Sequence, residues 1–428
     1  MPEAHTPQSI AIIGLGYVGL PLAIQFAKAG LQVVGIDLDP KKVDQLNAGK
    51  SYIAHIPEKS IVDITESGKF RATGDFSAIS DCQGVILCVP TPLNQHREPD
   101  ISYVLDSGKA LAPHLTKGTL VSLESTTYPG TTDTDLRKVI EEHSGMVAGE
   151  GFHLAYSPER EDPSNPDSKV ESIPKLVGGY SPACLEKAIA MYRVCIKTLV
   201  PVESCRVAEA AKLLENIFRS VNIALVNELK LIYEAMGIDI WKVIEAAKTK
   251  PFGFMPFYPG PGLGGHCIPI DPFYLTWKAR EFDQHTRFIE LAGEINTSMP
   301  DHVVGKCVLA LNAESKSVNN SRILVLGLAY KPNVDDDRES PAYTLIEKLE
   351  ELGAKVDYND PYIPKIQPTR DHAQLAGRVS AELSDDYDLV LIATNHREYH
   401  EYDFSGYRCP IVDTRNCVSD PPAKYYKA

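Results

Sequence analysis

The sequence has no run of apolar residues that approaches the ~20 needed to cross a membrane as a helix. The first nine residues are mostly polar, so we also expect no export signal. Basic residues are the minority, since 43 Lys and Arg stand against 57 Asp and Glu and give a formal net charge of −14. This balance argues against nucleic acid and anionic membranes as partners, and it leaves open a local basic pocket for a phosphorylated ligand.

Disulfide and metal motifs are lacking as well. The nine cysteines are scattered from Cys82 to Cys417 and none stands in a CxxC pair, which fits reduced thiols in a cytoplasmic protein. His396 and His400 are four residues apart, but no third ligand is near them in the sequence and there is no HExxH pattern. We therefore expect no metal site and a cytoplasmic location.

The chain begins with a pattern typical of dinucleotide sites. At 428 residues it exceeds one ordinary core, so we expect two or three domains. A short apolar strand at 9–13 leads into Gly14-Leu15-Gly16-Tyr17-Val18-Gly19 and a helix that Gly30 ends, and a second strand at 32–36 delivers Asp37. A carboxylate there would repel a ribose phosphate, which favours NAD over NADP. A purely structural glycine turn is the alternative.

Three further predicted strands, at 84–89, 118–123 and 152–156, each end in a polar loop. In an open parallel sheet ligands bind at the carboxyl ends of the strands, so we expect these loops to face the cofactor. Turn formation alone also explains their hydroxyl groups and prolines.

Apolar residues recur at helical spacing from Ser204 to Met236, and Gly237 is a stop signal. The pattern predicts a helix of roughly 50 Å at ~1.5 Å per residue, which is long enough to bridge two domains and to offer a dimer interface. Lys212 and Asn216 are four residues apart and therefore on one face of this helix, within reach of one site. A solvated lysine is the alternative.

The stretch Gly260-Pro261-Gly262-Leu263-Gly264-Gly265-His266-Cys267 combines four glycines with a cysteine. Glycines let backbone amides approach a ligand, and cysteine is the side chain best suited to attack a carbonyl, so we interpret Cys267 as a nucleophile. The alternative is a small buried hydrophobe ahead of a helix that starts at Asp271-Pro272.

A second, smaller sheet follows a polar stretch at 312–320. Its predicted strands are at 322–326, 355–358, 388–393 and 410–413, with a helix at 341–352. The expected fold class is α/β, with two Rossmann-like parallel-sheet domains joined by a long central helix.

Seven ordered stretches closely resemble one family, the nucleotide-sugar 6-dehydrogenases of the UDP-glucose/GDP-mannose dehydrogenase type. They are GLGYVGLPLA, CVPTPL, STTYPGTT, SPERED, AKLLEN, GPGLGGHCIPIDP and GLAYKPNVDDDRES, and they cover essentially the whole chain. Around the cysteine the chain looks most like the branch that oxidises UDP-N-acetylhexosamines, in particular UDP-N-acetylglucosamine. UDP-glucose enzymes commonly have a basic residue and a second glutamate where this chain has Pro251 and Pro163.

The resemblance implies a four-electron oxidation at carbon six of a UDP-sugar, with two NAD molecules used in turn and no metal. It implies that Cys267 is the nucleophile, that Lys212 steadies the developing oxyanion and that Asn216 orients the sugar. Asp271 would support the hydrolytic water and Lys212, and Thr127 and Glu159 would hold that water or assist proton transfer. NAD would be held by Gly14, Gly16, Tyr17, Val18, Gly19, Asp37, Pro90, Thr91, Thr126 and Arg338, and the UDP-sugar by Arg160, Lys212, Asn216, Tyr258, Gly264 and Lys331.

The resemblance also implies an organisation and a setting. We expect an NAD-binding Rossmann domain at residues 1–203, a central helical dimerisation region with the cysteine loop at 204–311, and a Rossmann-like nucleotide-sugar-binding domain at 312–428. A homodimer in surface-polysaccharide precursor synthesis is implied. UDP-glucose, UDP-GalNAc and UDP-ManNAc stay open as substrates. Two rivals stay open, a two-electron hydroxyacid dehydrogenase, which would need no cysteine, and a non-catalytic regulator that binds NAD and sugar nucleotides.

Overall fold

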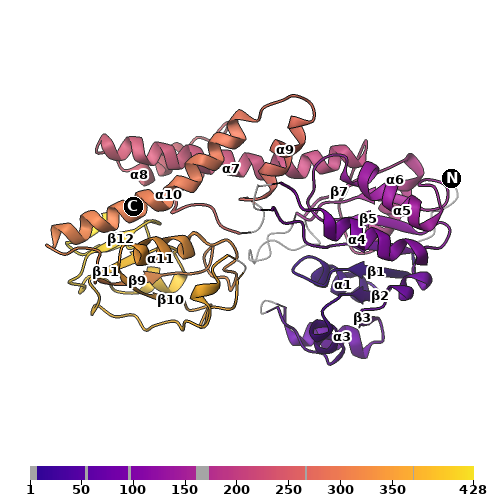
Figure 1. Cartoon of the computed structure of the whole chain (residues 1–428), viewed down its shortest axis with the longest axis horizontal. Coiled ribbons are helices and arrows are strands. Elements are labelled where there is room, and N and C mark those ends of the chain that lie inside the picture. The colour runs from indigo at the N-terminus through magenta and orange to yellow at the C-terminus, as the bar shows by residue number, and fades with distance from the viewer. Residues whose placement is uncertain (1–6, 54–55, 95–97, 161–172, 266–267, 370) are drawn as a thin grey trace. The chain divides into compact units, whose positions relative to one another are not determined.

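The computed structural model describes residues 7–53, 56–94, 98–160, 173–265, 268–369 and 371–428. The chain forms two compact units, one of Met1–Glu215 with Phe273–Gln284 and one of Asn216–Pro272 with His285–Ala428. Each unit has one sheet with helices on both of its faces (Figure 1), which confirms the predicted α/β class. The division into three domains stays a prediction. Within these ranges no helix is long and apolar enough to span a membrane.

The first unit is built on an eight-stranded sheet with the order β3-β2-β1-β4-β5-β6-β7-β8. Neighbouring strands are parallel except β6 and β7, which are antiparallel. The strands are β1 (Ser9–Ile13), β2 (Gln32–Ile36), β3 (Phe70–Thr73), β4 (Gly84–Leu87), β5 (Leu120–Leu123), β6 (His153–Tyr156), β7 (Lys175–Gly179) and β8 (Leu199–Val202). The helices are α1 (Gly19–Lys28), α2 (Pro40–Asn47), α3 (Glu58–Glu66), α4 (Ser102–Leu111), α5 (Arg137–Ser144), α6 (Pro182–Tyr192) and most of α9 (Asp271–Arg280).

Alternation along β1 shows how this sheet is covered on both faces. Ile10 and Ile12 pack with α1, α3 and α6 in one apolar cluster. Ala11 and Ile13 pack with α4 and α5 in another. Successive side chains of a strand point to opposite faces of the sheet, so a strand that is buried on both faces must be apolar throughout. In β1 every residue after Ser9 is apolar and buried.

The second unit contains a fully parallel sheet with the order β10-β9-β11-β12-β13. Its strands are β9 (Arg322–Leu326), β10 (Lys355–Asn359), β11 (Leu389–Ile392), β12 (Ile411–Asp413) and β13 (Tyr425–Lys427), and its helices are α8 (Ile240–Ala247), α10 (Arg287–Ala313), α11 (Pro341–Glu351) and α12 (Arg397–Glu401). One face of the sheet packs on α10 and α11, and the other packs on α12 and the chain around Phe404. The predicted second sheet is thus confirmed.

The long helix is α7, Cys205–Ala235, one residue shorter at each end than predicted. Gly237 has a φ of +72°, which ends the helix in a conformation that glycine adopts without strain. The first residues of α7 belong to the first unit, and the residues from Asn216 onward belong to the second. One continuous helix therefore joins the two sheets, as the sequence predicted.

In the second unit a charged cluster joins α7 to α10. Glu234 lies near three basic groups, with an ion pair to Lys306, 3.4 Å from Oε2 to Nε2 of His302 and 3.8 Å from Oε2 to Nζ of Lys230. Burial lowers the pKa of His302 to about 4, and the neighbouring Lys230 adds to this effect. His302 is therefore neutral near pH 7, when its Nε2 can accept from Lys230 at 3.5 Å.

We predict that His302 makes stability sensitive to acid. Its pKa is depressed in the folded state, so its contribution is complete above about 6.5 and is lost as the pH falls to about 4. The shift corresponds to at most about 3 kcal/mol of unfolding free energy. Denaturant unfolding of the wild type and of His302→Gln between pH 4 and pH 7 would measure it, and the variant should show a flatter pH dependence.

His400 is exposed, so His400→Gln is the matched control and should keep the wild-type slope. Equal slopes for His302→Gln and the wild type would show that His302 does not carry the acid sensitivity.

Candidate functional site

The glycine turn after β1 contains two glycines that leave no room for a side chain and one that has open space beside it. Gly14 has a φ of +89°, and a Cβ there would lie 2.6 Å from the carbonyl oxygen of Cys88. A Cβ on Gly19 would overlap the carbonyl oxygen of Gly14. A Cβ on Gly16 would meet nothing within 4 Å. Gly14 and Gly19 are therefore explained by packing, whereas the space at Gly16 fits the close approach of a pyrophosphate to the start of α1.

Asp37 follows β2 and fixes the turn from the other side. Its carboxylate accepts the backbone N–H of Leu15 at 3.1 Å and that of Asp39 at 3.0 Å, and Lys42 approaches it at 3.3 Å. The side chain is only 11% exposed. The structure thus places Asp37 beside the glycine turn, as an acidic ligand of the ribose requires, and the preference for NAD over NADP stays a prediction.

The loops after β4 and β5 are tied to one another at the carboxyl edge of the sheet. The hydroxyl of Thr91 donates to the carbonyl of Thr126 at 2.9 Å, and that of Ser125 donates to the carbonyl of Val89 at 2.7 Å. The hydroxyl of Tyr274 on α9 donates to the carbonyl of Thr91. The structure therefore brings Thr91 and Thr126 together, with Pro90 exposed next to Thr91 in the chain.

The other two residues of the glycine turn that we expect to contact NAD, Tyr17 and Val18, lie partly buried just before α1.

Thr127 is fully buried, and its hydroxyl has no hydrogen-bond partner among the described residues. Such an orphan calls for an explanation such as a water or a ligand. The loop beyond it is held by Glu209 of α7, which accepts the N–H of Gly130 at 2.7 Å and the N–H and hydroxyl of Thr132 at 2.9 and 2.7 Å. Thr127 therefore occupies a fixed position with its hydroxyl available.

Glu159 lies on the loop after β6, next to a buried lysine that the sequence analysis did not single out. Lys175, the first residue of β7, has its Nζ 3.4 Å from Oε2 of Glu159 and 3.0 Å from Oε2 of Glu124. Arg160 instead pairs with Glu215 at 2.8 Å and donates to the carbonyl of Pro174 at 2.7 Å. The guanidinium of Arg160 is thus engaged within the first unit, and its predicted contact with substrate stays a prediction.

Lys212 differs from the other buried lysines. Its residue is 8% exposed on α7, and no described residue forms a hydrogen bond or an ion pair with its ammonium. Lys175 and Lys230, which are also buried, both lie beside carboxylates. A buried cation without a partner is costly, so Lys212 has the character expected of a group that meets an anion from outside the chain. The solvated-lysine alternative is wrong, because this residue is buried.

Asn216, one turn further along α7, is buried and fixes a buried carboxylate in the second unit. Its Nδ2 donates to Oδ2 of Asp271 at 2.5 Å, and its Oδ1 accepts from Arg219 at 2.6 Å. Asp271 is the first residue of α9, where the partial positive charge of the helix terminus favours a carboxylate. The predicted helix start at Asp271 is confirmed, and the pair Asn216 and Asp271 is brought together.

The glycine-rich loop, residues 260–265, is anchored inside the second unit. The N–H of Gly260 donates to Asn227 at 3.0 Å, and Asn227 donates to Asn296 on α10 at 2.9 Å. A Cβ on Gly264 or Gly265 would come within 2.8 Å of the side chain of Tyr330. These two glycines are required by packing, and their role toward a ligand stays a prediction. His266 and Cys267 lie outside the described residues.

The remaining predicted ligand residues of the second unit have partners of their own. Tyr258 stacks on Trp241 and donates to Glu245 at 2.9 Å. Arg338 forms a two-point contact with Asp336, at 2.8 and 2.6 Å. The ammonium of Lys331 lies 5.6 Å from the ring centre of Tyr330. Their contacts with NAD or with a UDP-sugar stay predictions.

Arg415, which follows β12, was missed by the sequence analysis. Its Nε donates to the carbonyl of Ala393 at 2.9 Å, and none of the described carboxylates forms an ion pair with it. Burial lowers the pKa of Arg415 to about 10, so it still carries its charge at neutral pH. A cation at the carboxyl end of a parallel strand suits a phosphorylated ligand. The only signal in the sequence was its place directly after a short apolar strand.

The eight described cysteines are all free thiols, which agrees with the reduced state expected from the sequence. Burial raises the pKa of Cys82 to about 11 and that of Cys307 to about 12, and it raises the pKa of Cys88 and Cys205 as well. Because the thiolate is the nucleophile, such thiols are poor attacking groups.

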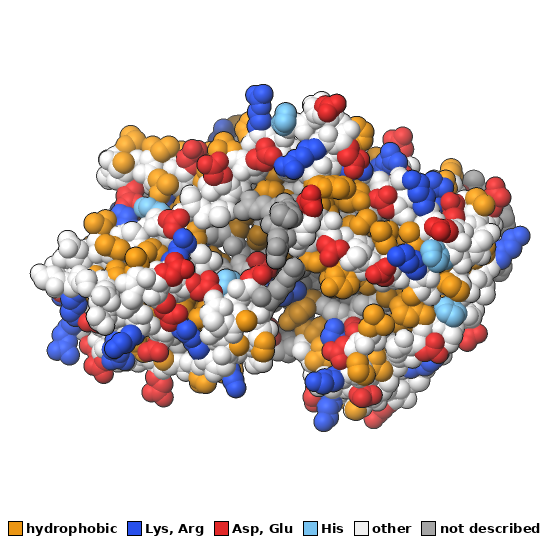
Figure 2. Space-filling view, viewed as in Figure 1, with side chains coloured by type: hydrophobic (Ala, Val, Ile, Leu, Met, Phe, Trp, Pro, Cys, Tyr) orange, Lys and Arg blue, Asp and Glu red, His pale blue; other side chains and the backbone are white. Residues whose placement is uncertain are grey.

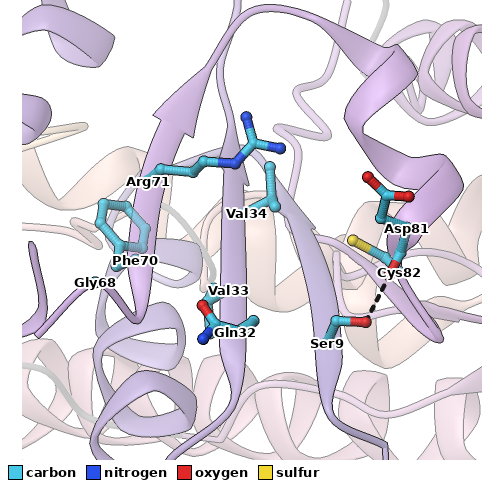
Figure 3. Close-up of a pocket in the computed structure, with 9 residues that line it drawn as sticks. All are labelled: Ser9, Gln32, Val33, Val34, Gly68, Phe70, Arg71, Asp81 and Cys82. Carbon is cyan, nitrogen blue, oxygen red and sulfur yellow. Dashed lines mark hydrogen bonds between the residues drawn. The ribbon is translucent and has the colours of Figure 1, made fainter.

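One described pocket, of about 310 Å³, lies away from these residues (Figure 3). Ser9 and Gln32, the first residues of β1 and β2, line it together with Phe70, Arg71 and Cys82. It is therefore at the amino ends of the strands, opposite the glycine turn. Ligands of such sheets bind at the carboxyl ends, so this pocket is not the dinucleotide site.

Comparison with known proteins gives matches over nearly the whole chain. Sequence models of the UDP-glucose/GDP-mannose dehydrogenase family match in three parts, the NAD binding domain at residues 8–196, the central domain at 206–298 and the UDP binding domain at 324–420. The first match confirms NAD as the cofactor, for which the residues around Gly16 and Asp37 fit.

Individual relatives carry several substrate names. A UDP-N-acetyl-D-glucosamine 6-dehydrogenase from Pseudomonas aeruginosa is 36% identical over 391 residues, 91% of each chain. The structure of a UDP-D-ManNAc dehydrogenase from Pyrococcus horikoshii has a TM-score of 0.88 at 32% identity over 98% of both chains. A UDP-glucose dehydrogenase structure from Pyrobaculum islandicum has a TM-score of 0.86 at 26% identity, over 100% of this chain and 98% of that one.

The glycine turn yields a prediction that separates packing from ligand binding. Gly19→Ala should lower stability by about 1–3 kcal/mol because its Cβ overlaps a backbone oxygen. Gly16→Ala should leave stability unchanged and weaken NAD binding by about tenfold or more, near 1.4 kcal/mol. Thermal unfolding and fluorescence titration with NADH measure the two effects. Wild-type affinity in a folded Gly16→Ala variant would contradict the assignment of this space to the pyrophosphate.

Proposed function

The chain belongs to the UDP-glucose/GDP-mannose dehydrogenase family, and we propose that it oxidises carbon six of a UDP-N-acetylhexosamine, UDP-N-acetylglucosamine first, to the uronic acid. The overall change converts one primary alcohol, two NAD⁺ and one water into a carboxylate, two NADH and three protons. NAD supplies the acceptor for one hydride in each of the two oxidations. The chain's own residues must then hold the substrate and keep the intermediate aldehyde from escaping.

The observation that carries this proposal is the buried ammonium of Lys212, which has no hydrogen-bond or ion-pair partner in the described part of the chain. Negative charge develops on the sugar's reacting oxygen in both oxidations and in the final hydrolysis. A fixed cation in a water-poor site stabilises such charge, and removal of one donor of this kind commonly costs ~3 kcal/mol of barrier. A regulator that had lost its chemistry would have no reason to keep an unpaired buried charge.

We propose Cys267 as the nucleophile. The burial of Cys82, Cys88, Cys205 and Cys307 and their raised pKa values make those thiols unsuitable. Attack by the Cys267 thiolate on the aldehyde forms a thiohemiacetal, and loss of a hydride from it leaves a thioester. Water then breaks the carbon–sulfur bond, which releases the carboxylate and restores the thiol.

Hydrolysis needs a positioned water and a proton acceptor. The orphaned hydroxyl of Thr127 and the carboxylate of Glu159 supply these functions in the first unit, and Asp271, oriented by Asn216, supplies a carboxylate in the second. We assign the sugar to Lys212 and Asn216. We assign the UDP moiety to Lys331, Gly264, Tyr258 and Arg160, with Arg415 as a further cation.

We predict two NADH per sugar with UDP-N-acetylglucosamine, and a higher kcat/KM for it than for UDP-GalNAc, UDP-ManNAc, UDP-glucose or GDP-mannose. Cys267→Ser should lose at least about 10³-fold in steady-state turnover, because an oxygen ester hydrolyses far more slowly than a thioester, and it should still bind the substrate. Absorbance at the NADH band, mass spectrometry of the product and titration of the variant provide the measurements.

Cys82→Ser is the control, since its buried thiol lies at the amino edge of the first sheet and should tolerate the change with full activity. One NADH per sugar, or near wild-type turnover by Cys267→Ser, would refute the thiol mechanism. Preference for another UDP-sugar would correct the substrate and leave the chemistry in place.

We also propose a homodimer in which α7 packs against the same helix of a second copy. Six apolar residues of α7 and its end are more than 40% exposed, namely Val207, Leu214, Phe218, Leu225, Ile232 and Met236. Their spacings of 7, 4, 7, 7 and 4 residues place all of them within an arc of about 40° at ~100° per residue. A straight stripe one helix wide is matched by an identical stripe across a two-fold axis. Figure 2 shows exposed hydrophobic side chains at the upper left, where Figure 1 labels α8, the helix that follows α7 in the chain.

We predict that Leu225→Lys yields a monomer, because two buried ammonium groups would face each other across the axis. Leu309→Lys is the matched control, since Leu309 is exposed on α10 outside the stripe. Light scattering at micromolar concentration measures the molar mass of the wild type and of each variant in solution. A wild-type monomer, or a dimer that persists in Leu225→Lys, would count against this interface.

A further inference from the structure

We infer that Lys175 is a positioning residue for the oxidation, and that its buried ammonium, held by Glu124 and Tyr192, fixes the carboxylate of Glu159 in its ionised form. This inference rests on the proposed role of Glu159 in proton transfer. All four side chains belong to the first unit, on the loop after β5, on α6, on β7 and on the loop after β6.

The geometry is that of one cation shared by two carboxylates. The Nζ of Lys175 is 3.0 Å from Glu124, 3.4 Å from Glu159 and 3.4 Å from the carbonyl of Pro158. The side chain of Lys175 is 5% exposed and that of Glu124 is 0% exposed, whereas that of Glu159 is 19% exposed. Glu159 is thus the one member of this trio that reaches toward solvent.

The carboxylate of Glu124 also accepts a hydrogen bond from α6. The hydroxyl of Tyr192 donates to its Oε1 at 2.7 Å, and Ser122 lies 2.9 Å from that hydroxyl. The ammonium of Lys175 also lies 5.3 Å from the centre of the Tyr192 ring. The backbone N–H of Arg160 donates to Oε1 of Glu159 at 2.7 Å. Each of these side chains therefore has a partner, and the network fixes their positions relative to one another.

The charges in this cluster depend on each other. Burial raises the pKa of Glu124, and Lys175 opposes this effect. Burial lowers the pKa of Lys175, but Glu124 and Glu159 outweigh it and raise the value above its ordinary range. Cys88, the remaining titratable group in the cluster, has a pKa raised by burial and by Glu124, so it stays a neutral thiol. Lys175 therefore keeps its proton throughout the working pH range.

A carboxylate that loses a neighbouring ammonium holds its proton to higher pH. Lys175→Met should therefore move the acidic limb of the kcat/KM profile to higher pH and lower kcat by about tenfold or more at neutral pH, with little change in the Kd for NAD. Lys175→Arg restores a cation and should recover most of the activity. Lys138→Met is the matched control, because Lys138 is an exposed lysine of α5.

The decisive experiment is a double-mutant cycle on the full chain. If Lys175 acts through Glu159, then Glu159→Gln should be slow, and adding Lys175→Met to it should cost nothing more. Because Lys175→Met alone leaves Glu124 buried without a counter-ion and endangers folding, Glu124→Gln/Lys175→Met serves as the folded neutral pair, and circular dichroism checks each variant.

The outcomes separate two failures. Near wild-type turnover by Glu159→Gln would refute the proposed role of Glu159 itself. A slow Glu159→Gln variant whose rate falls further, by the full single-mutant factor, when Lys175→Met is added would refute the positioning role alone. An unshifted acidic limb in the folded neutral pair would refute it as well.

Discussion

The geometry of this protein depends on the rigidity of one helix, α7. Its ~1.5 Å rise per residue fixes the intervals between Glu209, Lys212 and Asn216, because any change in them would break backbone hydrogen bonds. Glu209 holds the loop that follows Thr127, and Asn216 holds Asp271. The helix that carries Lys212 thus also orients one group in each unit, the loop after Thr127 in the first and Asp271 in the second. An insertion of one residue would turn these side chains to different faces.

Close packing explains why several motif positions are glycine without any appeal to a ligand. Gly14 and Gly19 are forced by backbone oxygens, and Gly264 and Gly265 by the ring of Tyr330. Gly16 is the exception, since open space surrounds it. A glycine motif is therefore a mixture of residues that shape the turn and residues that leave room for a ligand, and only coordinates separate the two.

The same distinction explains how far the sequence could be interpreted. The strands with four or five consecutive apolar residues, and α7 with its regular spacing, were predicted nearly to the residue. The strands β3, β7, β8 and β13 were not, because β7 ends in two glycines and β8 contains Pro201, which propensity alone assigns to loops. Lys175 was missed with β7. Its importance arises from Glu124, 51 residues away, and no local pattern reports such a pairing.

Buried lysines in this chain show two opposite solutions to one electrostatic problem. The ammonium of Lys175 is paired with the carboxylates of Glu124 and Glu159 in its own unit, and these ion pairs fix its position. Lys212 has no such partner among the described residues, and an unpaired buried charge destabilises the folded state by several kcal/mol. The cost is offset only when an anion arrives. An oxyanion that forms in the reaction is stabilised most by a cation that was already desolvated and fixed, because no reorganisation remains to be done at that moment. The lack of a partner for Lys212 among the described residues is therefore the feature on which its proposed role as the catalytic cation rests.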